Sequence, residues 1–401
     1  MRRRTTRLCG SAVFFCFLPW GNAFAQLQGH FSLQKGQYEV GEPIYLQFDL
    51  TNVGKESVRL IRGDRYSNCG GYKIEVWSGP PISHSSCDRG FAGSCLAGEQ
   101  IVAPGGTIHE RLLLNYQHHL AKAATYDIHA ALLVSYGSNR EELSVPADTL
   151  RVAEDFQIQL TDGTRETLKS AFQPFLADLA SKEEERQREA ARVIGSLAPA
   201  FLEDTILSMM VSATARPFAL LGLRRLDTVR SRAAFAEIVE GTAGYSYEKE
   251  RAIKYLSEMG DRKYFPLLLS VARQQPPNQA RDYVLAAARL GGENALPFVD
   301  SLLEDSDPFS HANGVMALSE TGTRSAIPIL IETLKSKETD LGKLASIGLI
   351  ELTHRTPFAD DKMYSDSPSV QYQDWSRWWL LHGKQASIYG PHQCGQIEPL
   401  N

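Results

Sequence analysis

The stretch YVLAAARLGGENALP, residues 283–297, decides how the second half of the chain folds. It contains an apolar run with helical spacing, then a glycine, and six residues after that glycine a proline. The pattern also stands 31 residues earlier, in 252–266 (AIKYLSEMGDRKYFP), and 31 residues later, in 314–328 (GVMALSETGTRSAIP). The glycines are Gly260, Gly291 and Gly322, and the prolines are Pro266, Pro297 and Pro328. Glycine can end one helix in the left-handed conformation and proline fits the first turn of the next, so each unit is predicted to be a helical hairpin.

The same register extends beyond these three units. Segments 190–194, 221–223 and 345–349 fall on it without a gap. In the second helix of a unit the apolar residues share one face, and around Pro297 they are Ala295, Phe298, Val299, Leu302 and Leu303. A single hairpin cannot bury this face, so the hairpins must stack on one another. The pattern therefore predicts an all-α superhelical solenoid.

These residues resemble HEAT-like repeats, in the short form that is also found in bilin lyases. The resemblance covers the predicted repeat domain, residues 184–360, and implies a helical solenoid without specifying a chemistry. Some units depart from the pattern. The units around Ala198 and Val229 lack the glycine and the proline, so we expect distorted hairpins there. In the last unit Thr353 replaces the glycine, and a polar stretch, Asp360 to Ser369, replaces the second helix.

Residues 26–154 show a different pattern, in which short alternating runs rich in β-branched and aromatic residues are separated by turn residues. The expected strands are 44–50, 57–61, 72–77, 107–114, 126–136 and 142–152. This number of short strands predicts an all-β sandwich. The segment Tyr38 to Asn52, and Tyr126 near the penultimate strand, resemble bacterial immunoglobulin-like domains, which implies an adhesive or spacer role. Residues 155–183 are expected to form a linker and a leading helix.

Residues 1–25 have the order of a signal peptide, with four arginines, an apolar run from Leu8 to Trp20, and then Ala23-Phe24-Ala25. We expect cleavage before Gln26 and a periplasmic or extracellular product. Losing the four arginines changes the formal net charge from −5 to −9, which disfavours a nucleic-acid partner. No later stretch is apolar enough for a membrane span.

Four cysteines remain after the expected cleavage: Cys69, Cys87, Cys95 and Cys394. In an oxidising compartment an even number of cysteines favours disulfides. Our hypothesis is that two of the first three pair with each other and that the third bonds Cys394, which would tie the tail to the sandwich. The alternative is a zinc site that includes His84, but the cysteines lack the paired C-x-x-C spacing of zinc ligands.

The C-terminal segment, residues 361–401, is interpreted as a polar loop, a capping helix and a tail. Trp375, Trp378 and Trp379 stand at i, i+3 and i+4, so they share one side of that helix. A helix of this kind would cover the apolar end of the repeat stack, as a terminal repeat requires. The alternative interpretation is an aromatic ligand patch for a sugar or a peptide.

No pattern typical of an enzyme is found in the sequence. A nucleophile serine between glycines, H-E-x-x-H and a phosphate-binding glycine loop are all missing, and no metal or cofactor site is predicted. The histidines are dispersed and have no carboxylate or cysteine partners close in sequence, so we interpret them as surface or packing residues. We therefore expect a protein without catalytic activity.

The outward positions of the second helices form a ladder of mixed charge, and we expect it to line the concave side of the solenoid. Its residues are Ser270, Arg273, Ser301, Glu304, Glu332 and Lys335. Such a surface suits a protein or peptide partner, and the predicted function is an exported scaffold or adaptor of the bacterial envelope. The alternatives are a lyase-like cofactor-attachment protein and a protease-inhibitor-like module that uses the loop from Ser78 to Gly98. No pattern predicts the oligomeric state.

Overall fold

The computed structural model describes residues 26–62, 71–79, 98–118, 120–137, 148–241, 247–355, 368–390 and 399–400. The predicted signal peptide and all four cysteines of the disulfide hypothesis lie outside these residues, as do His84 and most of the polar stretch 360–369. Those predictions are therefore not tested by the fold.

The N-terminal region is a β-sandwich, as predicted. Its strands are β1 (Leu27–Leu33), β2 (Gln37–Glu39), β3 (Tyr45–Asn52), β4 (Val58–Arg62), β5 (Tyr72–Ser78), β6 (Gly98–Val102), β7 (Thr107–Leu113), β8 (Ala124–Gly137) and β9 (Asp148–Thr161). One sheet has the order β1-β3-β7, and the other has the order β2-β9-β8-β4-β6 with β5 also paired to β8. Alternate side chains from both sheets, such as Phe31, Phe48 and Ile128, are buried between them. The predicted domain boundary at residue 154 lies inside β9, which continues to Thr161.

The helical region follows directly. It contains α2 (Arg165–Leu179), α3 (Glu184–Leu197), α4 (Glu203–Met209), α5 (Arg216–Leu226), α6 (Val229–Glu240), α7 (Tyr247–Glu258), α8 (Phe265–Gln274), α9 (Arg281–Gly291), α10 (Leu296–Leu303), α11 (Pro308–Glu320), α12 (Ala326–Thr333), α13 (Thr339–Thr353) and α14 (Pro368–His382). A short helix, α1 (Leu114–Gln117), follows β7, and β10 (Ile388–Tyr389) pairs with β11 (Pro399–Leu400) near the C-terminus. From α3 onward the helices pack in pairs, so the predicted helical repeats are confirmed as an arrangement of helices.

The turns inside the pairs follow the predicted chemistry with one exception. Gly260 and Gly322 adopt positive φ values of 70° and 62°, as a left-handed helix end requires. Gly291 does not, because it is the last residue of α9, and its neighbour Gly292 takes the positive φ. The units without glycine keep their turn by placing other residues in the left-handed region, namely Ala198, Asp227 and His354. Each such residue costs about 1–2 kcal/mol of backbone strain.

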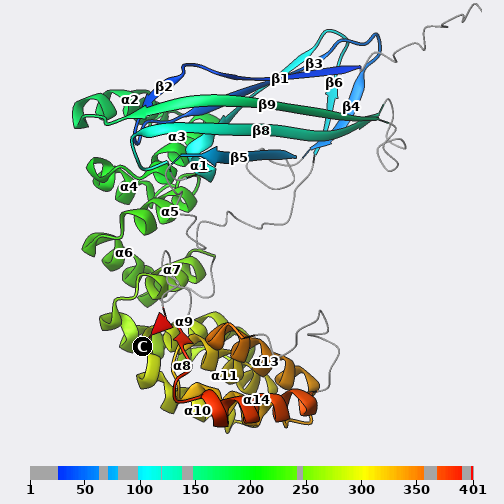
Figure 1. Cartoon of the computed structure of the whole chain (residues 1–401). Coiled ribbons are helices and arrows are strands. Elements are labelled where there is room, and N and C mark those ends of the chain that lie inside the picture. Colours follow the sequence, from blue (N-terminus) through cyan, green and yellow to red (C-terminus); the bar gives the residue numbers. More distant parts are fainter. Residues whose placement is uncertain are drawn as a thin grey trace, which may run out of the picture.

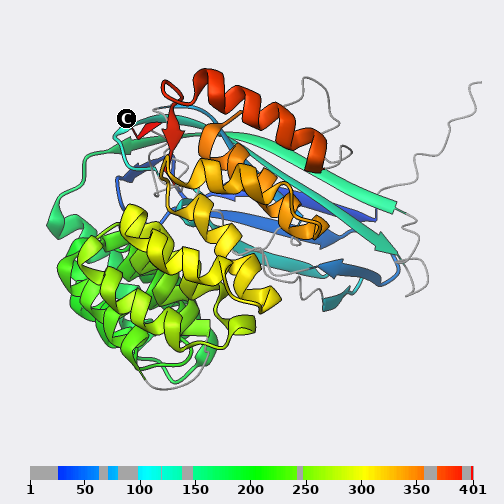
Figure 2. The same cartoon turned by 90° about the horizontal axis from the view of Figure 1, so that it is seen from below.

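The pairs build an arch below the sandwich (Figure 1). The first helix of each pair, such as α5, α7, α9 and α13, lies on the inner side of the arch, and the second helices, such as α4, α6, α8 and α10, lie on the outer side. Seen from below, the last helices pass across the sandwich in projection (Figure 2). Each first helix from α3 to α13 also packs against the next first helix. The arch therefore has a continuous inner surface of first helices that faces the sandwich.

The sandwich is attached to the first helices by a buried contact. Leu113 of β7 and Tyr45 of β3 belong to the same apolar core as α2, α3 and the later helices. The Tyr45 hydroxyl donates to Glu189 of α3 at 3.1 Å, and the guanidinium of Arg111 lies 3.9 Å from the centre of the Tyr45 ring. Phe175 of α2 stacks on the same ring, with centroids 6.4 Å apart. This contact covers the N-terminal end of the helical array.

The other end of the array is covered by α14. Trp375 is fully buried against the helical core, while Trp378 and Trp379 are partly buried. Arg355 pairs with Asp374 at 2.9 Å and places its guanidinium 4.9 Å from the centre of the Trp375 ring. A buried Trp375 is what the cap interpretation of this helix requires.

Candidate binding surface

The ladder predicted from the sequence is exposed but does not line the inner face. Ser270 and Arg273 lie on α8, Ser301 lies on α10 and Glu304 is the residue that follows α10; both helices are on the outer side (Figure 1). The last two are Glu332 of α12 and Lys335, just after that helix; they pair with each other at 2.7 Å and contact Tyr372 of the capping helix. The expected concave position therefore does not hold for the residues on α8 and α10, and the ladder as a partner surface stays a prediction. The sequence showed which positions are outward, but not towards which side the stack bends.

The direction of the bend follows from small side chains on the first helices. A Cβ added at Gly195 of α3 would overlap the backbone of Phe218 in α5, and a Cβ at Gly222 would come within 3.1 Å of the Gly195 Cα. Alanines serve the same purpose where α9 meets its neighbours, for example Ala287. Because the first helices approach one another more closely than bulkier helices could, the array curves towards them.

Ion pairs join successive first helices along the inner side. Arg224 of α5 lies 3.1 Å from Glu258 of α7, and Arg289 of α9 lies 2.7 Å from Glu320 of α11. Glu258, Arg289 and Glu320 occupy the same position in successive units. The pair of Arg224 and Glu258 is almost fully buried, and the other pair is mostly buried. These charges are neutralised within the protein and serve to hold the helices in register.

A cavity of about 230 Å³ opens between α7 and α9 on this inner side. It is lined by Glu250, Lys254, Ser257, Asp282, Leu285, Ala286 and Arg289. Asp282 is partly buried and has no hydrogen bond or ion pair to another described residue. Burial raises the pKa of Asp282 and the nearby Glu250 carboxylate raises it further, which together outweigh the opposite effect of the Arg281 and Lys254 charges.

The hydroxyl of Tyr283, next to Asp282 on α9, is also unsatisfied. It is buried and has no hydrogen-bond partner among the described residues. Burial raises the pKa of Tyr283, and the charges of Asp282 and Glu250 raise it further. The cavity therefore holds a carboxylate with no hydrogen bond or ion pair to a described residue, and the buried hydroxyl next to it in the sequence has no described hydrogen-bond partner. An unsatisfied buried group costs stability unless something pairs with it.

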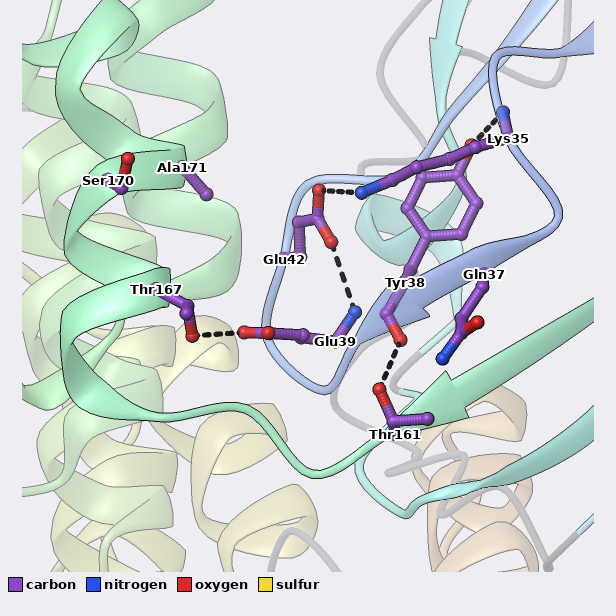
Figure 3. A pocket seen from close by; sticks show the side chains of 9 residues that line it. All are labelled: Lys35, Gln37, Tyr38, Glu39, Glu42, Thr161, Thr167, Ser170 and Ala171. Carbon is purple, nitrogen blue, oxygen red and sulfur yellow. Dashed lines mark hydrogen bonds and ion pairs between the residues drawn. The ribbon is translucent and has the colours of Figure 1, made fainter.

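A second cavity, of about 480 Å³, lies where the sandwich meets α2 (Figure 3). Its charged side chains are already paired. Lys35 binds Glu42 at 2.6 Å, the second carboxylate oxygen of Glu42 accepts from the backbone of Glu39, and Thr167 donates to the Glu39 carboxylate. Burial raises the pKa of Tyr38, whose ring lies beneath the Lys35 ammonium. These pairs form a polar connection between β2 and α2 and leave no unpaired charge for a ligand.

Three histidines of the sandwich have carboxylate partners that are distant in sequence. His30 lies 2.8 Å from Glu154, and His109 lies 2.7 Å from Asp49. His129 lies 2.7 Å from Asp155. The partners come from neighbouring strands and are distant in sequence. Among the described residues no group of three or more metal-ligating side chains is close enough to hold an ion, and no helix is long and apolar enough to cross a membrane.

The molecule is thus a β-sandwich fixed to an arch of helical pairs, with an incompletely paired polar cavity on the inner side. Neither a family model nor a curated relative matches the chain. Among solved structures it is similar to a chain of the complex of CpcE and CpcF of phycocyanin lyase from Nostoc sp. PCC7120. The identity is 17%, with a TM-score of 0.29, over 52% of this chain and 82% of that chain. This is a distant likeness of helical repeats and carries no functional argument.

Proposed function

We propose that the chain is a non-catalytic adaptor that binds a protein or peptide partner on the inner face of the arch. The observation that carries the proposal is the cavity between α7 and α9. Charged residues elsewhere on this face, such as Arg289 and Glu320, pair with each other, whereas Asp282 has no such partner. A basic side chain from a partner would neutralise Asp282 and relieve its repulsion from Glu250.

The size and position of the cavity fit this function. A volume of about 230 Å³ is below that of typical pockets for small molecules but accepts one side chain. The cavity lies on a curved surface of several helices, which can contact an extended partner on both sides of it. The buried contact at Tyr45 holds the sandwich in place opposite this surface, so the partner would meet a preformed shape.

Export to the envelope and an immunoglobulin-like identity of the sandwich are part of the same proposal. The residues of the predicted signal peptide support export. The sandwich is supported by Tyr126, which is buried at the start of β8 and donates its hydroxyl to the Lys122 carbonyl at 3.0 Å. Immunoglobulin-like domains often have such a tyrosine near the start of their penultimate strand.

Site-specific photo-crosslinking in the producing organism tests the inner-face proposal. A photoreactive residue in place of Leu285 should crosslink a partner, whereas the same residue in place of Ser301, on the outer helix α10, should not. The charge reversal Asp282→Arg should remove the crosslink while the circular dichroism stays unchanged. The matched control is the joint substitution of Arg273 and Glu332 by alanine, which removes two charges of the ladder and leaves the cavity between α7 and α9 untouched. Crosslinks from the outer position, or a loss caused only by the outer variant, would refute the proposal.

A further inference from the structure

An exposed tryptophan is held in a fixed orientation on the outer face of the larger sheet. Glu75 of β5, His129 of β8 and Asp155 of β9 lie directly opposite one another in the strand register. The pairing of β5 with β8 shifts between Val76 and Ser78, so the residue between them, Trp77, sits at a β-bulge. Bulges change the direction of a side chain. Here Trp77 lies flat on the ring of His129.

The geometry leaves one face of the indole open. The two ring centroids are 4.5 Å apart and the rings are inclined by only 10°, so His129 covers one face of Trp77. Trp77 is nevertheless 62% exposed, and this exposure must belong to its other face and edge. The indole N–H donates to Glu75 at 3.3 Å, and His129 is held by Asp155 at 2.7 Å. The open aromatic face is therefore preorganised.

The surroundings of this face are negatively charged. Glu75 and Asp155 flank the stacked rings, and Asp127 lies one row further along β8. Hydrogen bonding by Lys73 and then Trp77 lowers the pKa of Glu75, and hydrogen bonding by Ser78 and then Gln157 lowers the pKa of Asp127. Both carboxylates are thus ionised at neutral pH. Lys73 pairs with Glu75 at 2.7 Å and His129 pairs with Asp155 at 2.7 Å, so even with both basic groups charged the three carboxylates leave the group with a negative charge.

We propose that Trp77 and the carboxylates around it bind a cationic guanidinium or alkylammonium group, presented by an arginine or lysine of a basic peptide segment. A cation over an indole face is attracted by the ring, and nearby carboxylates add to the attraction. An arginine side chain can stack flat on the open face while its edge reaches the free carboxylate oxygen of Asp155, whose side chain is 71% exposed. This site lies on the sandwich and does not depend on the proposed inner-face function.

The test is an NMR titration of the mature chain with N-acetylarginine amide. The indole N–H signal of Trp77, assigned by its loss in Trp77→Phe, should shift saturably with a millimolar dissociation constant, and the shift should weaken with added salt because the attraction is electrostatic. Backbone amides of β8 report binding in the variants. Trp77→Ala should weaken binding at least threefold, and Glu75→Gln at least twofold. Leu133→Ala, an exposed residue of the same face, should leave it unchanged.

The competing occupant is a neutral sugar, which would stack on the same ring without needing its charges. Maltotriose serves as the probe for this alternative under the same conditions. A larger saturable shift with maltotriose than with the arginine amide would overturn the cation proposal. An arginine titration that is unaffected by Trp77→Ala, or that does not saturate, would overturn it as well.

Discussion

Replacing Trp375 by alanine should unfold the C-terminal end of the array before the rest of the molecule. Trp375 is among the largest fully buried side chains, and it packs edge-to-face on Trp378 with centroids 5.5 Å apart. Truncation of a buried tryptophan to alanine costs about 3–5 kcal/mol. The Arg355 guanidinium would lose the ring that it covers, so we expect a value in the upper part of this range.

The loss of stability should be confined to the C-terminal helices, because each helical pair contacts only its neighbours. Hydrogen exchange measured by mass spectrometry should show faster exchange in α12 and α13, by roughly a thousandfold for 4 kcal/mol, and little change in α3 to α6. Trp378→Ala should have a smaller effect of the same kind, since Trp378 is partly exposed. The matched control is Leu380→Ala on the same helix, which is 85% exposed and should change stability by less than about 0.5 kcal/mol.

The cap interpretation would be refuted by unchanged exchange in α12 and α13 of Trp375→Ala. A loss of binding to a sugar or a peptide without any loss of stability in Trp378→Ala would favour the ligand-patch interpretation instead.

Three further substitutions test single residues. Tyr45→Phe removes a hydrogen bond to a carboxylate at the sandwich–helix contact, and should lower the free energy of unfolding in urea by about 1.5 kcal/mol. Asp282→Asn should raise the melting temperature at neutral pH and change it little below the ordinary pKa of 3.8. The reason is that the folded protein raises this pKa, so ionisation of Asp282 as the pH rises lowers the stability. Gly195→Ala should lower the free energy of unfolding by about 1–3 kcal/mol in the same urea assay, because its Cβ would overlap the Phe218 carbonyl. The control is Gly36→Ala, which has open space around it and should not lower the free energy of unfolding in this way.

The local signals for the helical pairs were sufficient to predict the repeat architecture. The prolines fix where second helices begin: Pro266 and Pro297 each lie in the first turn. The exact turn residue was less predictable. Gly291 and Gly292 are adjacent, and their roles are decided by packing, since Gly291 faces the ring of Phe265 at a distance that leaves no room for a Cβ. Only the folded structure shows that contact.

The sequence does contain information on the direction in which the helical array bends, but the pattern of exposed residues does not reveal it. The sequence pattern identifies exposed residues such as Arg273, but residues on the convex side and on the concave side are equally exposed. The distribution of small residues carries the information, because Gly195, Gly222 and Gly348 all lie on first helices and let them approach closely. A comparison of side-chain volume between first and second helices would have placed the concave side correctly.

The Trp77 site could not be predicted from the alternation of apolar and polar residues along the strands. The sequence placed Trp77 and His129 on strands, but their stacking depends on which residues face each other across β5, β8 and β9 and on a shift of one residue at the bulge. A slip of one position would send Trp77 to the opposite face. Register of this kind is set by the whole sheet.

The two covered ends of the array also limit how molecules of this protein can associate. In an open stack of repeats, the exposed end of one molecule matches the exposed start of the next, and such head-to-tail contacts can continue into fibres. Here Tyr45 and Leu113 occupy the first end and Trp375 occupies the last. The number of repeats in a particle is therefore set by the length of one polypeptide, and growth by end-to-end addition of further copies is blocked.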